Sequence, residues 1–395
     1  MTKIKVSIVT ETYYPEVNGV ANTLKYWVEG LQNKGIYTQI IRPKQNPDDA
    51  SVESDQCETY TVAGLPIPRY KELKFGLPCK RKLVSLWKKS PPSAIYVATE
   101  GPLGLSAVRA AKKLNIPILS GFHTNFQSYS KYYGLGFLEP LIFGFLRYFH
   151  NQTRGTIVPT KKQQEWLSRK GFENVSVLSR GIDSSRFTPS KRCSRLRERW
   201  HVTDGQVVCL YVGRVAGEKN IALAIKAYEN VTATHPDCVF VVVGDGPLRK
   251  TLESEHPGIR FVGMKTGEEL AKYYASADLF LFPSKTDTFG NVVTEAMASR
   301  LGIVAFNDAA AKEHLSHGNS AYIADLDNDE AFIQLTLEAI ANSCELEKIR
   351  ENAYQLAQTI TWNNIVNQFV KKLLEKPPLR LGDETHESSQ NINSI

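Results

Sequence analysis

The sequence predicts an α/β fold made of two doubly wound parallel sheets. Short, apolar, β-branched runs alternate with helical patterns along most of the chain, which is the order of parallel strands joined by helices. The length of 395 residues exceeds one ordinary core, because domains usually hold roughly 100–200 residues. Apolar residues make up 42% of the chain and charged residues 23%, which excludes fibrous and mostly disordered classes.

Each half of the chain supplies its own set of predicted strands. In the first half the strand Lys5–Thr10 precedes a helix from Ala21 to about Lys34, and Ala94–Ala98 and Ile116–Phe122 are further strands. The second half is predicted to contain a second, independent sheet. Its strands are Val207–Gly213, Phe240–Gly244, Ile259–Gly263, Leu279–Pro283 and Ile303–Phe306.

The stretch Arg180–Pro189 contains Gly, Ser, Asp and Pro and predicts the boundary between the halves. The helical run Ile365–Leu374 follows the second sheet, and the polar segment after it has no periodicity. We therefore expect a first domain at 1–188 and a second at 189–362. A C-terminal helix at 363–376 and a disordered tail at 377–395 complete the predicted organisation.

Charge is distributed unevenly along the chain. Residues 1–190 hold 26 Lys and Arg against 14 Asp and Glu, a net charge of +12, and the rest of the chain carries −5. A basic first half favours contact with a polyanion or an anionic surface. The sequence has no run of about 18 uncharged apolar residues and no recognisable secretory signal, so we expect a cytoplasmic protein. Six scattered cysteines without CxxC spacing are typical of reduced, structural thiols.

One basic segment, 71–90, is a candidate membrane contact. It contains seven basic residues and one acidic residue, with apolar and aromatic residues between them, a composition that can lie on an anionic bilayer. The candidate membrane patch is Lys80, Arg81, Lys82 and Trp87. The alternative is a solvated helix face over an ordinary core. The segment 133–148 adds further aromatic and apolar residues.

Two motifs in the first half are candidate ligand contacts. Gly19 lies in the motif Pro15–Val20, shortly after the first strand, where a glycine lets backbone amides approach a phosphate or sugar. His123 lies at the end of an apolar strand, where sites form in open α/β sheets. The alternatives are a plain Asn-Gly turn and a structural histidine. The other histidines show no metal-ligand spacing with His123.

Arg214 and Lys219 follow the strand that opens the second half. Two cations at a helix start suit a diphosphate, and the alternative is a solvated helix start. The Walker pattern is absent. The nearby Gly244–Asp245–Gly246 lacks the third glycine of a dinucleotide motif, so these glycines are expected to shape a turn.

The richest motif follows the strand 279–283. Asp287 is expected in the loop before a helix that begins near Gly290, and Glu295 about one turn inside that helix. Both carboxylates can point into one cleft, where they would accept hydrogen bonds from sugar hydroxyls. The alternative is an acidic N-cap with an exposed Glu.

Together these motifs resemble the retaining, nucleotide-sugar-dependent glycosyltransferases of family 4, which have the GT-B fold of two Rossmann-like domains facing across a cleft. The similarity covers about residues 5–375 and is nearest to glycolipid-making enzymes such as lipid α-mannosyltransferases and sulfoquinovosyl-diacylglycerol synthase. The matching residues are Asn18–Val20, Phe122–Asn125, Arg180–Asp183, Gly213–Arg214, Glu218–Asn220, Gly244–Gly246, Asp287–Gly290 and Glu295–Ala296.

The resemblance implies a role for each matched position. Gly19 would lie beside the donor phosphates, His123 at the donor sugar and reacting centre, and Arg214 and Lys219 on the diphosphate. Asp287 takes the place of the family's usual Glu and would bind sugar hydroxyls, while Glu295 would bind the ribose. The remaining implied contacts are the backbone around Val262 and Gly263 with the base, and that of Thr288, Phe289 and Gly290 with the sugar and phosphates.

The implied activity is transfer of a hexose with retention to a lipid or glycan acceptor. The first expected donor is GDP-mannose, and the protein is expected to associate peripherally with the inner face of the membrane. The alternatives are a UDP-sugar-dependent hexosyltransferase, a soluble nucleotide-sugar epimerase of the same fold and a non-catalytic nucleotide-sugar-binding subunit. No cofactor or metal is expected, because two cations and helix N-termini can stabilise the leaving diphosphate. No nucleic-acid motif is present.

Overall fold

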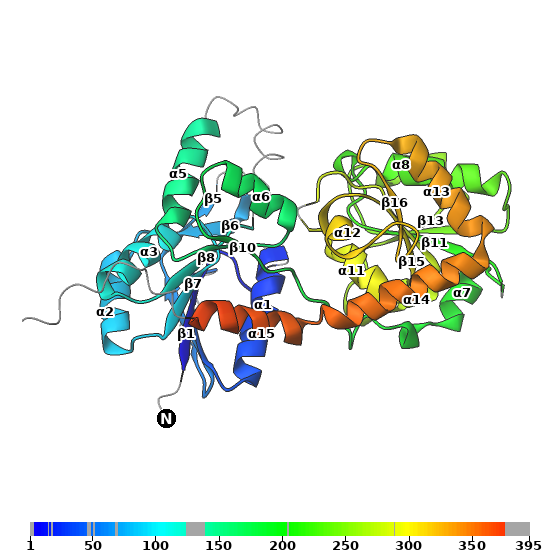
Figure 1. Cartoon of the computed structure of the whole chain (residues 1–395). Coiled ribbons are helices and arrows are strands. Elements are labelled where there is room, and N and C mark those ends of the chain that lie inside the picture. The colour runs from blue at the N-terminus through cyan, green and yellow to red at the C-terminus, as the bar shows by residue number, and fades with distance from the viewer. Residues whose placement is uncertain are drawn as a thin grey trace, which may run out of the picture.

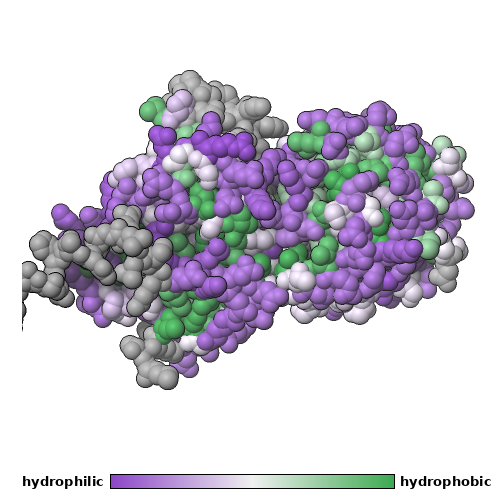
Figure 2. Space-filling model, in the orientation of Figure 1, coloured by the Kyte–Doolittle hydropathy of each residue, from purple (hydrophilic) through white to green (hydrophobic). Residues whose placement is uncertain are grey.

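The computed structural model describes residues 4–14, 16, 19–45, 49, 52–67, 70–123, 139–203, 205–287 and 289–375. It consists of two α/β halves that lie side by side (Figure 1). The predicted tail at 377–395 lies outside these residues. Hydrophilic residues predominate on the surface in the view of Figure 2, because the helices bury their apolar faces against the sheets.

The first half is organised around an eight-stranded sheet in the order β10-β9-β8-β7-β1-β2-β4-β3. Its strands run parallel except β3, which pairs antiparallel with β4. A separate hairpin is formed by β5 (Gly64–Ile67) and β6 (Tyr70–Gly76). The strands of the large sheet are β1 (Lys5–Val9), β2 (Tyr37–Pro43), β3 (Val52–Glu53), β4 (Cys57–Val62), β7 (Ala94–Val97), β8 (Ile118–Gly121), β9 (Thr156–Val158) and β10 (Val175–Val177).

Helices cover both faces of this sheet. Alternating residues of β1 separate the two cores: Ile8 packs with Trp27 of α1, whereas Val9 packs with Trp87 of α2 and Phe149 of α5. This period of two is what a strand buried on both faces requires. The helices of this half are α1 (Gly19–Asn33), α2 (Lys80–Lys89), α3 (Pro102–Leu114), α5 (Glu139–Asn151) and α6 (Lys161–Arg169).

The second half contains a six-stranded parallel sheet in the order β13-β12-β11-β14-β15-β16. Its strands are β11 (Val208–Val212), β12 (Val239–Val243), β13 (Arg260–Gly263), β14 (Leu279–Phe282), β15 (Gly302–Phe306) and β16 (Tyr322–Ala324). Its helices are η2 (Pro189–Lys191), α7 (Ser194–Arg199), η3 (Gly217–Lys219), α8 (Ile221–Thr232), α9 (Arg249–Glu255), α10 (Gly267–Ser276), α11 (Asn291–Ala298), α12 (Ala309–His314), α13 (Asp329–Ala341) and α14 (Ser343–Thr359).

The last described helix, α15 (Trp362–Leu374), returns to the first half and packs along α1 (Figure 1). The Phe369 ring stacks on Trp27 with ring centroids 4.1 Å apart. Gly30 of α1 allows this close approach, because a Cβ there would lie 2.5 Å from a methyl carbon of Val366. The Arg154 guanidinium donates to the Leu373 carbonyl over 3.1 Å, so it satisfies an orphan acceptor at the helix C-terminus.

The predicted fold class is confirmed, and each predicted strand is present with ends that differ by at most two residues. The sequence analysis did not predict β2 to β6, β9, β10 or β16. In β2 and β4, polar residues break the apolar pattern. Gln39 of β2 is fully buried, and its amide oxygen accepts hydrogen bonds from Ser7 and Trp87. A buried polar group of this kind is tolerated once it is hydrogen-bonded. In the connecting segment, Ile182 and Phe187 pack into the core of the second half.

Candidate active site

The carboxyl ends of two neighbouring strands bring the motif loops of the second half together. β11 pairs with β14, so the loops that follow them, 213–220 and 283–290, lie at the same edge of the sheet. Asn220 Nδ2 donates to the Pro283 carbonyl over 3.2 Å, and Thr286 Oγ1 donates to the Glu218 carbonyl over 2.9 Å. These bonds fix the two loops against each other.

Lys219 and Asp287 form an ion pair across these loops. Lys219 Nζ donates to Asp287 Oδ1 over 2.8 Å, and both side chains are mostly buried. The second carboxylate oxygen, Asp287 Oδ2, is buried without a hydrogen-bond partner among the described residues. Because a buried unpaired acceptor is unfavourable, this oxygen is suited to a hydroxyl group of a ligand.

Arg214, the other predicted cation, has a different environment. Its side chain is 65% exposed, and Nη1 lies 3.1 Å from Glu218 Oε1. The structure therefore brings Lys219 to Asp287 but leaves Arg214 at the surface of the same loop. An exposed pair of this kind contributes little to stability, so Arg214 can leave Glu218 for an anion at small cost.

Helix α11 carries the second carboxylate. Gly290 precedes it with φ +79°, in the left-handed region that favours glycine. Phe289 is buried, and Thr288 lies outside the described residues. Glu295 Oε2 accepts a hydrogen bond from the Tyr274 hydroxyl over 2.9 Å. Burial raises the pKa of Glu295 to about 7, although the Tyr274 bond opposes this shift.

The predicted base contacts lie at the carboxyl end of β13, the outermost strand of the same sheet. Val262 and Gly263 end β13, whose neighbour β12 pairs with β11. The Gly263 carbonyl accepts a hydrogen bond from the Gly244 amide over 3.0 Å. Gly244 has φ +145°, and a Cβ there would lie 1.9 Å from the Gly213 carbonyl oxygen, so this glycine allows two loops to meet.

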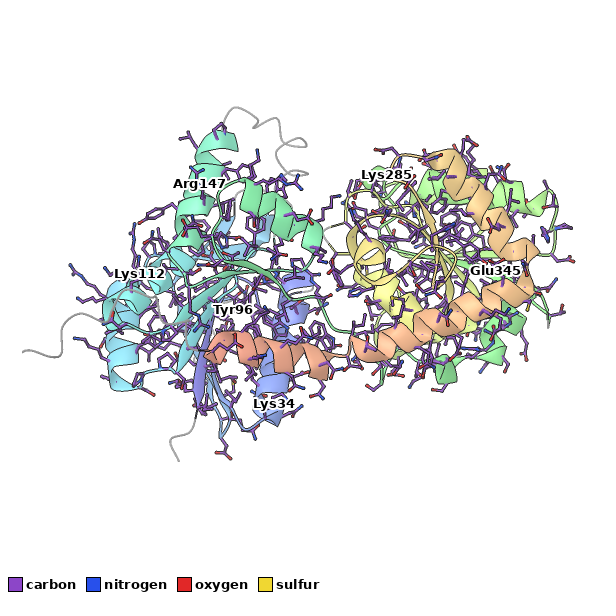
Figure 3. The ribbon with its side chains drawn as sticks, in the orientation of Figure 1. Lys34, Tyr96, Lys112, Arg147, Lys285 and Glu345 are labelled. Carbon is purple, nitrogen blue, oxygen red and sulfur yellow. The ribbon has the colours of Figure 1, made fainter. Side chains whose placement is uncertain are left out.

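His123 follows β8 in the first half. Its Nε2 lies 2.7 Å from the Tyr96 hydroxyl, and its Nδ1 is buried without a partner among the described residues. Burial and the positive charge of Arg180 lower the pKa of His123 to about 3. The imidazole is therefore neutral at pH 7 and has one ring nitrogen free for a ligand. Tyr96 lies in the interior of the first half (Figure 3).

Arg180, to which the sequence analysis assigns no role, lies between the two halves. A Cβ on Gly19, the first residue of α1, would lie 2.9 Å from Arg180 Nη1. The same nitrogen donates to Asn291 Oδ1 of α11 over 3.3 Å. The guanidinium carbon lies 5.6 Å from the centre of the Phe289 ring. The only sequence signal for this residue was its position in the Arg180–Asp183 motif.

Other polar contacts also join the halves. Ser179 Oγ lies 3.0 Å from His314 Nε2, and Lys162 Nζ lies 2.6 Å from Asp308 Oδ1. Both second-half partners belong to α12 or to the residue before it. These contacts hold α12 against the first half.

The structure corrects the predicted membrane patch at one residue. Trp87 is 1% exposed, and its Nε1 donates to Gln39 Oε1 over 2.8 Å, so it belongs to the core and cannot face a bilayer. Lys80, Arg81 and Lys82 are exposed at the start of α2. Segment 71–90 is also divided, because β6 ends at Gly76 and α2 begins at Lys80. In the part of the chain that the structure describes, no helix has the length and apolarity of a membrane span.

Comparisons with known proteins agree with this geometry. The model of "Glycosyltransferase Family 4" matches residues 17–186, and that of "Glycosyl transferases group 1" matches residues 194–356. A GDP-mannose-dependent alpha-mannosyltransferase of Mycobacterium tuberculosis is 32% identical over 77% of this chain and 79% of its own. An alpha-monoglucosyldiacylglycerol synthase of Streptococcus pneumoniae is 26% identical over 83% of this chain and 74% of its own.

Solved structures share the fold. The sucrose-phosphate synthase of Thermosynechococcus elongatus superposes with a TM-score of 0.76, at 17% identity, over 94% of this chain and 98% of its own. At that level of identity the similarity concerns the fold alone. The two halves of this chain therefore have the two-domain architecture that its motifs predict.

Proposed function

We propose a function for this chain on the premise that it belongs to glycosyltransferase family 4, as its family-model matches and its mannosyltransferase relative show. It transfers mannose from GDP-mannose to a lipid acceptor at a membrane surface, with retention of the α configuration. The observation that carries the proposal is the Lys219–Asp287 pair with its unpartnered Oδ2. The names of the two relatives favour a transferase over the epimerase alternative.

The donor is proposed to lie along the edge of the second sheet. Lys219 and Arg214 bind the diphosphate, and Asp287 Oδ2 accepts a hydrogen bond from a sugar hydroxyl. Glu295 accepts from the ribose, and the backbone at Val262 and Gly263 contacts the base. On the other side, Gly19 approaches the phosphates and His123 Nδ1 contacts the donor sugar. The loop at Phe289 and Gly290 completes the sugar site.

The leaving group is proposed to be stabilised without a metal ion. Breaking the bond between the anomeric carbon and the phosphate oxygen leaves negative charge on the nucleoside diphosphate. Fixed cations and helix N-termini aimed at that charge stabilise it more in the transition state than in the ground state. Activity is therefore expected to be the same with and without EDTA.

The ionisation of Glu295 predicts how nucleotide binding depends on pH. Because burial raises the pKa of Glu295 to about 7 in the free protein, most of this carboxyl group is protonated at pH 6. The ionised form is the better acceptor for ribose hydroxyls, so binding is coupled to proton loss. GDP-mannose, whose diphosphate has no proton that titrates in this range, is expected to bind about tenfold more tightly at pH 8 than at pH 6. Isothermal titration at both pH values checks this, and Glu295→Gln should remove the dependence.

The outer helices of the first half suit an anionic membrane surface. The described residues of α2 and α3 include eight cations and no acidic residue. Beside them, Leu141, Phe145 and Tyr148 of α5 are 72%, 41% and 51% exposed. Lys112 of α3 lies on the side of the first half that is away from the second half (Figure 3). Basic residues bind anionic lipid while exposed apolar residues enter the interface.

Neutralising the start of α2 tests this membrane contact. Each basic residue near an anionic surface contributes about 1 kcal/mol, so Lys80→Gln, Arg81→Gln and Lys82→Gln together should weaken binding to phosphatidylglycerol vesicles by about 100-fold. Vesicle sedimentation measures the effect. The matched control neutralises three exposed lysines of the second half, Lys250, Lys272 and Lys348. If both variants bound the vesicles equally well, the proposed membrane contact through α2 would be wrong.

A thermal-shift panel tests the donor. A ligand that binds only the native state raises the apparent melting temperature by mass action. The purified protein is expected to shift with GDP and GDP-mannose, with EDTA present, and to shift less with UDP and ADP compounds. A larger shift with UDP-glucose would show that the donor is a UDP-sugar. If no nucleotide raised the melting temperature, the proposed donor site would be wrong.

A further inference from the structure

We infer that Arg180 binds a phosphate group held between the N-termini of α1 and α11. The inference rests on the proposed function and adds a substrate-binding residue to it. Arg180 is 9% exposed. Among the described residues it forms no ion pair with a carboxylate, and its Nε is buried without a hydrogen-bond partner. Its only described side-chain bond is the 3.3 Å contact from Nη1 to Asn291 Oδ1.

The surroundings of the guanidinium are electrostatically unfavourable in the free protein. Gly19 begins the fifteen-residue helix α1, and Asn291 begins α11. Both helix N-termini carry a partial positive charge, and both lie near Arg180 Nη1. A Cβ added to Gly19 would lie 2.9 Å from this nitrogen, and the Asn291 side chain accepts its hydrogen bond. Burial lowers the pKa of Arg180 to about 10, so the group is still protonated at pH 7. Among the described residues, no carboxylate forms an ion pair with this buried cation.

The nearest candidate counter-ion on the protein is already engaged. Asp287 attracts Arg180 electrostatically, but its Oδ1 accepts the hydrogen bond from Lys219. A phosphate would accept charge-assisted hydrogen bonds from the guanidinium, and the partial positive charge at the N-termini of both helices would strengthen its binding. Arg180 would then contact the group that carries the developing charge, at the point where the two halves meet.

Two molecules could supply this phosphate: the diphosphate of the donor and the head group of a phospholipid acceptor. The neighbours Gly19, His123 and Phe289 are proposed donor contacts, so we assign the phosphate to the donor, on the side of the sugar. In that position the β-phosphate of GDP would reach Arg180, whereas GMP and guanosine would not.

The test compares wild-type protein with Arg180→Met. Loss of a charged hydrogen bond weakens binding by about tenfold to 100-fold. GDP is expected to bind that much more weakly to the variant, while GMP and guanosine change less than about twofold. Arg180→Lys, which keeps the charge, should recover part of the loss. Arg169→Met, at an exposed arginine of α6, is the control and should bind GDP like the wild type.

Stability separates a binding role from a structural one. Replacing an unpaired buried charge with an apolar side chain of similar size is often neutral or stabilising. The ligand-free Arg180→Met variant is therefore expected to melt at the wild-type temperature or above it. A variant that melts lower and binds GDP normally would show that Arg180 serves the fold, which overturns the inference.

The remaining outcomes identify the source of the phosphate or reject the site. Weaker binding of phosphatidylinositol vesicles with unchanged GDP affinity would assign Arg180 to an acceptor head group. Unchanged binding of both would overturn the inference and leave the proposed function intact. If the wild-type protein binds neither GDP nor UDP, both the inference and the proposed function fail.

Discussion

Lys219→Met is expected to lower kcat/KM for GDP-mannose by two to three orders of magnitude. Lys219 is held by Asp287 at 2.8 Å in a mostly buried position, so its charge is already oriented before the donor binds. Removing one preorganised electrostatic group from a site usually costs about 100-fold to 1000-fold in rate. The variant also removes the hydrogen bond that Lys219 donates to Asp287 Oδ1. Asp287 is then no longer oriented toward the sugar, and the contact with the diphosphate is lost as well.

Lys226→Met is the matched control, because Lys226 lies one to two turns into α8 and forms an exposed ion pair with Glu330. Steady-state rates at several GDP-mannose concentrations measure both variants. Far-ultraviolet circular dichroism and the melting temperature report whether each is folded. A folded Lys219→Met enzyme with wild-type kcat/KM would show that the diphosphate lies elsewhere.

His123→Ala is expected to lower kcat about 100-fold. The Nδ1 atom of the neutral imidazole has no hydrogen-bond partner among the described residues, and the ring is oriented by the 2.7 Å contact of Nε2 with the Tyr96 hydroxyl. The pKa of about 3 means that the ring does not become charged between pH 5 and pH 8. Activity should therefore show no inflection from this histidine near pH 6.5.

Two further variants refine this result. Tyr96→Phe removes the contact to Nε2 but leaves the ring of His123 in place, so a smaller loss of about tenfold is expected from misorientation. His235→Ala, at a histidine whose ring contacts the neighbouring Thr234, should leave kcat unchanged. If the His123→Ala enzyme kept the wild-type kcat, His123 would not belong to the reacting centre.

The sequence predicted the fold because its signals are local. The runs 207–213 and 279–283 are apolar and β-branched, and in a parallel sheet buried on both faces such runs are the strands. The motifs then follow the strands at their carboxyl ends, which is where α/β folds bind ligands. For that reason Lys219 and Asp287, 68 residues apart, could be expected in one site before their contact was known.

The features that could not be predicted from the sequence depend on contacts between residues far apart in the chain. Trp87 belongs to a basic, amphipathic segment, and only the position of Gln39 on β2 shows that its indole faces the core. Beyond its place in the Arg180–Asp183 motif, Arg180 gave no local signal, because its neighbours Gly19 and Asn291 are more than 100 residues away in the sequence. Arg180 is buried without an ionic partner among the described residues only because the two halves come together around it. No local sequence pattern marks such a residue.

Transfer of label from GDP-mannose tests the central claim most directly. Purified protein is incubated with radiolabelled GDP-mannose, EDTA and phosphatidylglycerol vesicles that contain diacylglycerol or phosphatidylinositol, with labelled UDP-glucose in parallel reactions. The proposed function predicts that mannose moves to the lipid fraction in an α linkage as GDP is released. Transfer from UDP-glucose alone, or conversion of the nucleotide sugar without any acceptor, would contradict it.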